Sequence, residues 1–260
     1  MLLFLKVILV PLLIGGVTLA ARRWGPQIGG VFTALPVVAG PAFSFFAIEQ
    51  GHAFAANAAQ ATMFGAVALA AFCIAYGLSA RRAPWPVSVL LGLVAFFAAT
   101  PILYRAHLSA GVELLLAVAA LLLARYMVPM PGRAVAAPAH SAWDVPLRML
   151  AAAALVLLLT SAGGSLGSTW SGILTAFPTA VTIVAVFTHA QRGAEAVLQF
   201  LRGVVPGLMS FTIFCFVMAI ALPASTLPAA LASALAAQIA LQSVIVLRIR
   251  SSSREIPATQ

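Results

Sequence analysis

Glu113 is the only carboxylate that lies clearly inside an apolar stretch of this 260-residue sequence. An acid inside a membrane helix is costly to ionise, and such residues commonly bind or relay protons and cations. Glu113 is therefore a candidate coupling group for the movement of a proton or cation. Arg105 and His107 lie nearby in the chain, so a structural ion pair explains this acid equally well.

Residues that would support catalysis, metal binding or cofactor binding do not come together in the sequence. The four His are scattered without metal-ligand spacing, and the two Cys both lie in apolar runs. We find no nucleophile motif, no phosphate-binding loop and no pair of carboxylates. The sequence therefore predicts a protein that is not an enzyme, with no catalytic residue, metal site or cofactor.

The strongest motif is Gly-x-x-Thr-Ala-x-Pro, which the chain contains twice. The first copy spans residues 30–36 and the second spans residues 172–178, so that 142 positions separate Thr33 from Thr175. The same offset relates Gly51 to Gly193 and Cys73 to Cys215. Self-similarity at a fixed spacing indicates a repeated structural unit. We expect two copies of one unit, at 1–106 and 143–250.

Each motif is expected to begin a short helix. Proline is tolerated in a first helical turn, and Thr33 or Thr175 is placed to cap that turn. Helices over 34–50 and 176–191 would be about 24 Å long, whereas the hydrocarbon core of a bilayer is about 30 Å thick. The glycine-rich residues before each helix would then enter the membrane as irregular backbone, which is tolerated where it lines a cavity.

Such paired, interrupted helices indicate a transporter binding site, because their free N–H groups suit an anionic or strongly polar ligand. Alternatively, each motif only starts or kinks a tightly packed helix. The candidate substrate-binding residues are Gly30, Thr33, Pro36, Gly172, Thr175 and Pro178.

Composition predicts an all-α polytopic membrane protein, because 63% of the residues are hydrophobic, 7% are charged and mean hydropathy is +1.11. The net charge of +9 comes from loop arginines and indicates membrane orientation, so no nucleic-acid partner is expected. Hydropathy predicts about nine transmembrane helices. They cover about 2–20, 31–50, 57–79, 86–104, 108–127, 146–163, 172–190, 197–222 and 227–247.

The arrangement of these helices is predicted to be a 4+1+4 inverted repeat. The fifth helix belongs to a linking segment, 107–142, that also contains a cytoplasmic loop, and residues 251–260 form a cytoplasmic tail. Since this fifth helix carries the chain across the membrane, the two four-helix units have opposite topology, as in many secondary transporters. Nine crossings place twelve basic residues on one side and only Lys6 and Arg105 on the other. The N-terminus is therefore expected outside and the C-terminus in the cytoplasm.

Further polar residues lie within or beside the predicted helices. Gln238 and Gln242 are four residues apart and share one helix face, so they are expected to join helices or to line a polar path. Lys6 and Arg148 occupy matching positions in the two units, and we expect both to reach toward lipid headgroups; the alternative is a bond to a neighbouring carbonyl in the other half.

Each unit resembles the GlpM-like family of small bacterial inner-membrane proteins, through its Gly-x-x-Thr-Ala-x-Pro segment and the Glu-Gln-Gly or Gln-Arg-Gly that follows some fifteen residues later. The resemblance covers most of 1–105 and part of 143–250. It implies a multi-pass protein of the bacterial inner (plasma) membrane, without catalytic residues to transfer.

These observations favour a secondary transporter or permease for a small polar or anionic solute, with its site between the two motif-bearing helices. The alternative is a non-transporting membrane scaffold or an assembly partner of envelope or polysaccharide enzymes. The expected partners are the lipid bilayer, the small-molecule solute and, in a homo-oligomer, further copies of the chain.

Overall fold

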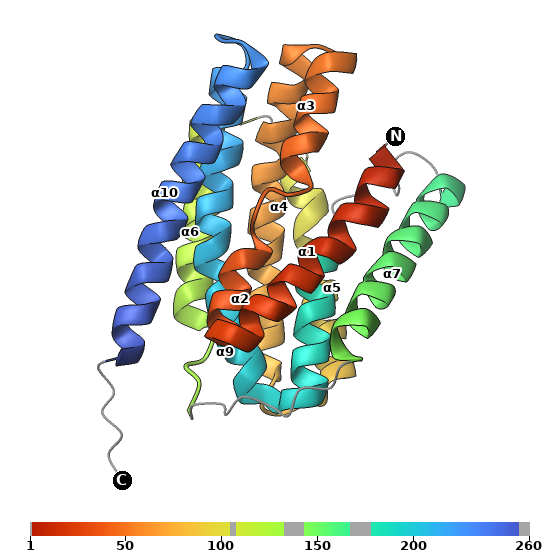
Figure 1. Cartoon of the computed structure of the whole chain (residues 1–260), viewed down its shortest axis with the longest axis vertical. Coiled ribbons are helices and arrows are strands. Elements are labelled where there is room, and N and C mark those ends of the chain that lie inside the picture. The colour runs from red at the N-terminus through yellow and green to blue at the C-terminus, as the bar shows by residue number, and fades with distance from the viewer. Residues whose placement is uncertain (1, 105–107, 133–142, 167–177, 255–260) are drawn as a thin grey trace.

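The computed structural model describes residues 2–104, 108–132, 143–166 and 178–254. This part of the chain is all-α, as predicted, and contains nine helices (Figure 1). They are α1 (Leu2–Trp24), α2 (Pro26–Thr33), α3 (Ala39–Glu49), α4 (His52–Ser79), α5 (Trp85–Tyr104), α6 (Ala110–Met127), α7 (Asp144–Leu166), α9 (Thr179–Ala221) and α10 (Leu227–Arg254).

The bundle is organised around α4 and α9, which pack against each other and carry the remaining helices. Helix α4 contacts α3, α5 and α6, whereas α9 contacts α2, α6, α7 and α10 (Figure 1). Large apolar side chains fill the interior, since Phe72 and Tyr76 of α4 and Phe200 and Phe214 of α9 are fully buried. Helices far apart in the sequence therefore share one core.

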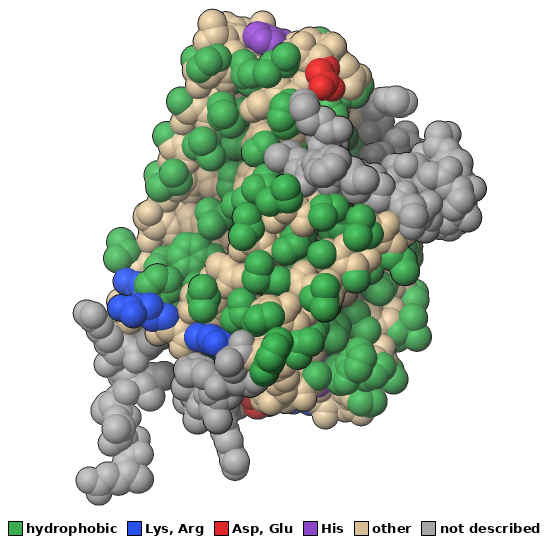
Figure 2. All heavy atoms as spheres, turned by 45° about the vertical axis from the view of Figure 1, so that its right-hand side comes forward, with side chains coloured by type: hydrophobic (Ala, Val, Ile, Leu, Met, Phe, Trp, Pro, Cys, Tyr) green, Lys and Arg blue, Asp and Glu red, His purple; other side chains and the backbone are tan. Residues whose placement is uncertain are grey.

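The outer surface is apolar, as expected of a multi-pass membrane protein. Among the described residues, five helices are long and apolar enough to cross a bilayer: Val7–Trp24, His52–Ser79, Ala110–Met127, Thr179–Ala221 and Leu227–Ser251. Leucines such as Leu90, Leu115 and Leu150 are more than half exposed, and apolar side chains cover the face shown in Figure 2. This surface is suited to contact with lipid chains.

Two glycines allow the chain to turn between packed helices. Gly51 precedes α4 with a φ of 90°, and Gly193 interrupts α9 with a φ of 78°. Side chains other than glycine are disfavoured at these backbone angles. The predicted eighth span and residues 179–190 of the predicted seventh span therefore lie in the two limbs of α9 on either side of Gly193.

Helix α6, which has no counterpart in the predicted repeat, is held at both ends. Near its N-terminal end the amide of Gln60 donates to the carbonyl oxygen of Leu108 at 2.9 Å. Beyond its C-terminal end the buried guanidinium of Arg202 donates to the carbonyl oxygen of Val128. Arg202 is one of the twelve basic residues that nine crossings place on the arginine-rich side, but it is 8% exposed because α9 places it among packed helices.

The polar tail begins later than predicted. Helix α10 continues to Arg254 rather than ending near residue 247, so 251–254 are helical. Residues 255–260 of the expected tail lie outside the described residues.

Candidate functional site

The first motif lies where one membrane helix is interrupted. Helix α2 ends at Thr33 and α3 begins at Ala39, so residues 34–38 form a break between them. At the end of α2 the backbone tightens, since Ala34 N donates to Val31 O at 3.3 Å and Leu35 N donates to Phe32 O at 3.2 Å. Pro36 lies buried within this break and contributes no N–H group.

The predicted position of the break is partly wrong. We expected the glycine-rich residues before Thr33 to be irregular and a helix to begin near residue 34. Instead Gly29 and Gly30 are helical residues of α2, and the irregular backbone follows Thr33. Thr33 does not cap α3, because its hydroxyl donates to Gly29 O at 3.1 Å within α2.

Two glutamines of α10 bond the backbone at this break. Gln238 Nε2 donates to Ala34 O at 3.0 Å, and Gln242 Nε2 donates to Val31 O at 3.3 Å. Ser210 of α9 lies beside them, with Oγ 3.3 Å from Gln242 Oε1. The prediction that the glutamines join helices is confirmed, because both side chains of α10 donate to carbonyl oxygens at the end of α2, of which Val31 O also accepts from Ala34 N.

Gln238 keeps one polar atom without a partner. The residue is fully buried, and its Oε1 has no hydrogen bond among the described residues. Exchanging its amide oxygen and nitrogen would place two acceptors together at Ala34 O, so the hydrogen bond there fixes the orientation of the amide. An unpaired amide oxygen in an apolar interior costs about 1–3 kcal/mol, so this atom is a ready acceptor.

Gly30 packs backbone against backbone. A Cβ atom at Gly30 would overlap Phe200 O of α9 and would come within 2.8 Å of Val204 N. The reverse contacts are equally close, because a Cβ at Gly203 would overlap Gln27 O and a Cβ at Gly207 would come within 2.8 Å of Val31 O. These glycines let α2 approach α9 closely. Gly30 thus has a packing role, and its role in binding stays a prediction.

The second motif lies mostly outside the described residues, and with it Gly172 and Thr175. Pro178 directly precedes α9, which begins at Thr179, and Pro178 O accepts from Thr182 N at 2.9 Å. The helix was expected to begin near residue 176, two positions before this proline. A contact between the two motifs therefore stays a prediction.

Glu113 bonds to α4 rather than to a cation in the described part of the chain. The residue is 3% exposed, and its Oε1 accepts from Gln60 Nε2 at 2.9 Å. Its Oε2 has no partner among the described residues. Arg105 and His107, the expected ion-pair partners, lie outside the described residues. Glu113 is thus separate from the break and has one carboxylate oxygen available for a proton or a cation.

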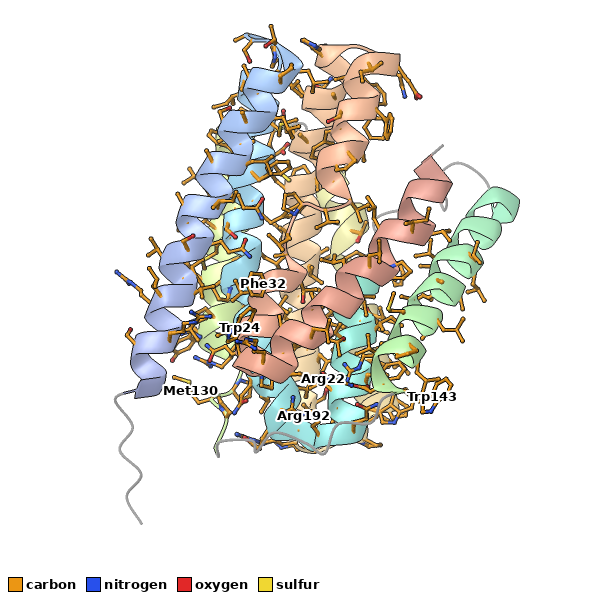
Figure 3. All side chains as sticks on the ribbon, in the orientation of Figure 1. Arg22, Trp24, Phe32, Met130, Trp143 and Arg192 are labelled. Carbon is orange, nitrogen blue, oxygen red and sulfur yellow. The ribbon has the colours of Figure 1, made fainter. Side chains whose placement is uncertain are left out.

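A polar cluster at the arginine-rich end was not predicted. Asp144 accepts hydrogen bonds from Arg22 at 3.0 Å and from Arg148 at 2.7 Å, and Arg148 also donates to Gln191 at 2.8 Å. Arg148 is only 4% exposed and does not reach toward headgroups. Figure 3 shows Arg22 and Arg192 at this end of the bundle. The four-residue spacing of Asp144 and Arg148 was a signal for the pair.

The cluster perturbs the ionisation of its acid. Burial raises the pKa of Asp144, but hydrogen bonds from Arg148, Gln191 and Arg22 more than offset it, and the pKa lies below its ordinary value. A second ion pair joins Arg81 to Glu195 at 2.7 Å near the same end, and its hydrogen bond raises the pKa of Arg81. These pairs tie helices together at one surface.

The described residues hold no group of three or more His, Cys, Asp or Glu side chains that could hold a metal ion. Comparison with known protein families, curated proteins and solved structures finds no match.

Proposed function

We propose that this protein is a secondary transporter or permease for a small polar or anionic solute. The observation that carries the proposal is the break at 34–38, where backbone carbonyls, Gln238, Gln242 and Ser210 come together between helices. Irregular backbone inside a membrane is costly unless it is buried in protein or lines a cavity, and transporters use such breaks as binding sites.

The depth of the break supports a site near the middle of the membrane. Helix α2 has 8 residues and α3 has 11, which correspond to about 12 and 16 Å. Neither helix spans a hydrocarbon core of about 30 Å, but together with the break they match its thickness. Gln238 lies about 16 Å along α10 from Leu227, which is also near the middle.

Helix boundaries support the predicted inverted repeat. The 142-residue offset of the motifs carries Leu2–Trp24 of α1 onto Asp144–Leu166 of α7, and it carries Gly51 onto Gly193. Helix α1 ends beside Trp24 and α7 begins beside Trp143, and both lie at one end of the bundle (Figure 3). The two matched helices therefore run in opposite directions, as inverted units require.

The proposed orientation places the arginine-rich end in the cytoplasm, within a bacterial inner membrane. Tryptophan and tyrosine are enriched where a membrane meets water. Four such residues are exposed at the starts or ends of helices at that end, which supports a membrane–water interface there: Trp24, Trp85, Tyr126 and Trp143. Nine crossings follow if α2 and α3 form one broken span and α9 forms parts of two.

A scaffold without transport is the second candidate, and the close packing of Gly30 against α9 favours it. A motif that serves only packing would explain the glycine and the proline without any solute. The resemblance to GlpM-like proteins stays a prediction and favours neither candidate.

Uptake into proteoliposomes tests the proposal. The purified full chain would be reconstituted and offered labelled carboxylates, phosphate, sulfate, amino acids and sugars. We expect saturable uptake of one class, with a loss of at least tenfold in Gln242→Leu, whose side chain cannot bond Val31 O. Ser233→Ala on the same helix is the matched control, because among the described residues Ser233 bonds its own helix, at Ala230 O. If no class of solute enters the proteoliposomes faster than it enters protein-free liposomes, the scaffold is favoured.

A further inference from the structure

We propose that the break at 34–38 binds a monovalent metal cation of the Na⁺ or K⁺ class, with Gln238 Oε1 as one of its ligands. The inference rests on the proposed function and deepens it, since it gives the transporter its coupling ion. It starts from the fully buried Gln238, whose amide is held at the break by Ala34 O and whose Oε1 has no partner among the described residues.

One acceptor at this site has no donor among the described residues. The two N–H groups of the Gln238 amide face Ala34 O at 3.0 Å and Gln242 Oε1 at 3.4 Å. Ser210 has one hydroxyl proton, which is directed to Gly207 O at 2.7 Å or to Gln242 Oε1 at 3.3 Å. Gln238 Oε1 remains without a donor. A guest at this position must therefore supply positive charge or a donor group.

The helix ends at the break favour a cation over an anion. The C-terminal end of α2 carries a partial negative charge, and carbonyls at such half-helix ends coordinate cations in transporters. Part of the N-terminus of α3 is already paired or lacks a donor. Gly40 N already donates to Pro36 O at 2.9 Å, Ala42 N donates to Val38 O at 3.1 Å, and Pro41 has no N–H group.

The ligand set favours a monovalent ion. The oxygens that the described residues bring to the break belong to amides, carbonyls and a hydroxyl, and none belongs to a carboxylate. Ca²⁺ and Mg²⁺ depend on carboxylates, and a divalent charge among neutral groups in a dry interior is costly to desolvate. Na⁺ and K⁺ carry half that charge, so their desolvation costs less and neutral oxygens suffice to bind them.

Salt-dependent thermal unfolding of the purified full chain tests the inference. The melting temperature would be measured in NaCl, KCl and choline chloride at equal ionic strength, so that the anion and the screening of charge stay constant. We expect a rise of about 3 °C in one of the metal salts over choline, saturating with concentration. Identical melting temperatures in all three salts at every concentration would overturn the cation site.

Variants locate the effect. Gln238→Met keeps the length of the side chain but removes the oxygen. The variant should melt at the same temperature in the metal salts as in choline chloride, even if that temperature differs from that of the wild type. Gln238→Glu adds a charge and should lower the half-saturating cation concentration at pH 8. The control Ser233→Ala should keep the wild-type response. A response that survives in Gln238→Met would place the cation elsewhere and overturn the inference.

The inference and the proposed function fail in different ways. Solute uptake that proceeds equally in choline chloride would leave a transporter without this cation site. Saturable stabilisation by the metal salt, lost in Gln238→Met but without uptake of any solute, would leave the cation site without transport.

Discussion

Replacement of Gly30 by alanine should destabilise the protein strongly, although alanine usually stabilises a helix. The added methyl group would overlap Phe200 O and lie 2.8 Å from Val204 N and 3.0 Å from a carbon of Gly203. All three are backbone atoms of α9, which cannot rotate away as a side chain would. Helices α2 and α9 would have to separate by about 1 Å to restore van der Waals contact.

Overpacking of a tight contact costs about 1–3 kcal/mol, and the upper end applies here because backbone must move. Alanine recovers about 0.5–1 kcal/mol of helix propensity. The net loss of free energy of unfolding is therefore about 2 kcal/mol. For a chain of this size, the melting temperature should fall by roughly 4–8 °C.

Tryptophan fluorescence during heating in detergent measures this loss. Gly65→Ala in α4 is the matched control, because a Cβ at Gly65 meets nothing within 4 Å. The control should gain about 0.5–1 kcal/mol from helix propensity alone. If Gly30→Ala melts at the same temperature as Gly65→Ala, the close approach of α2 and α9 is wrong, and the motif glycine becomes a stronger candidate for ligand binding.

Three other predictions concern the acids and the topology. Asp144→Asn should lower stability by about 3 kcal/mol by leaving the buried Arg148 without its carboxylate, as chemical unfolding would measure. Because the pKa of Asp144 is lowered, the ionised carboxylate contributes fully to stability above the ordinary pKa of 3.8, and this contribution is lost as the pH falls further. The Asn variant lacks the carboxylate and should therefore lose less stability than the wild type on acidification below about pH 4. Glu113→Gln keeps an acceptor for its neighbour on α4, so the melting temperature should change little. Unchanged uptake in this variant would make the acid structural, and loss of uptake would make it a second coupling group beside the break. A single cysteine at Gly51 should react with a membrane-impermeant thiol reagent added from outside. A single cysteine at Arg82 should react only after permeabilisation, and outside labelling at Arg82 would contradict nine crossings.

Local sequence features predicted the helices well because those features act over short distances. Apolar runs set the ends of α4 and α5 to within a few residues of the hydropathy expectation. Gly51 and Gly193 were recognised as a pair by their shared offset of 142 residues, and both have a positive φ. The shared face of Gln238 and Gln242 followed from a four-residue spacing, and both do reach the same backbone segment.

Tertiary partners were harder to predict because they come from distant parts of the chain. Arg148 looked like a residue for the lipid surface, but Gln191 on another helix binds it inside the protein. Arg202 was counted with the surface charges, although a carbonyl of residue 128 accepts its hydrogen bond. The break was placed too early, because the expected flexibility of Gly30 is used instead for contact with α9.

The break at 34–38 depends on the second half of the chain for its stability. Val31 O and Ala34 O receive their side-chain hydrogen bonds from α10, more than 200 residues away. If α10 moved away from α2, Val31 O would keep its bond from Ala34 N, but Ala34 O would lose the bond from Gln238, at a cost of about 1–3 kcal/mol in the apolar interior. A cation bound at the break would change that cost, so its binding would shift the balance between two arrangements of α2 and α10. Coupling in a transporter requires such a link between an ion and the relative position of two helices.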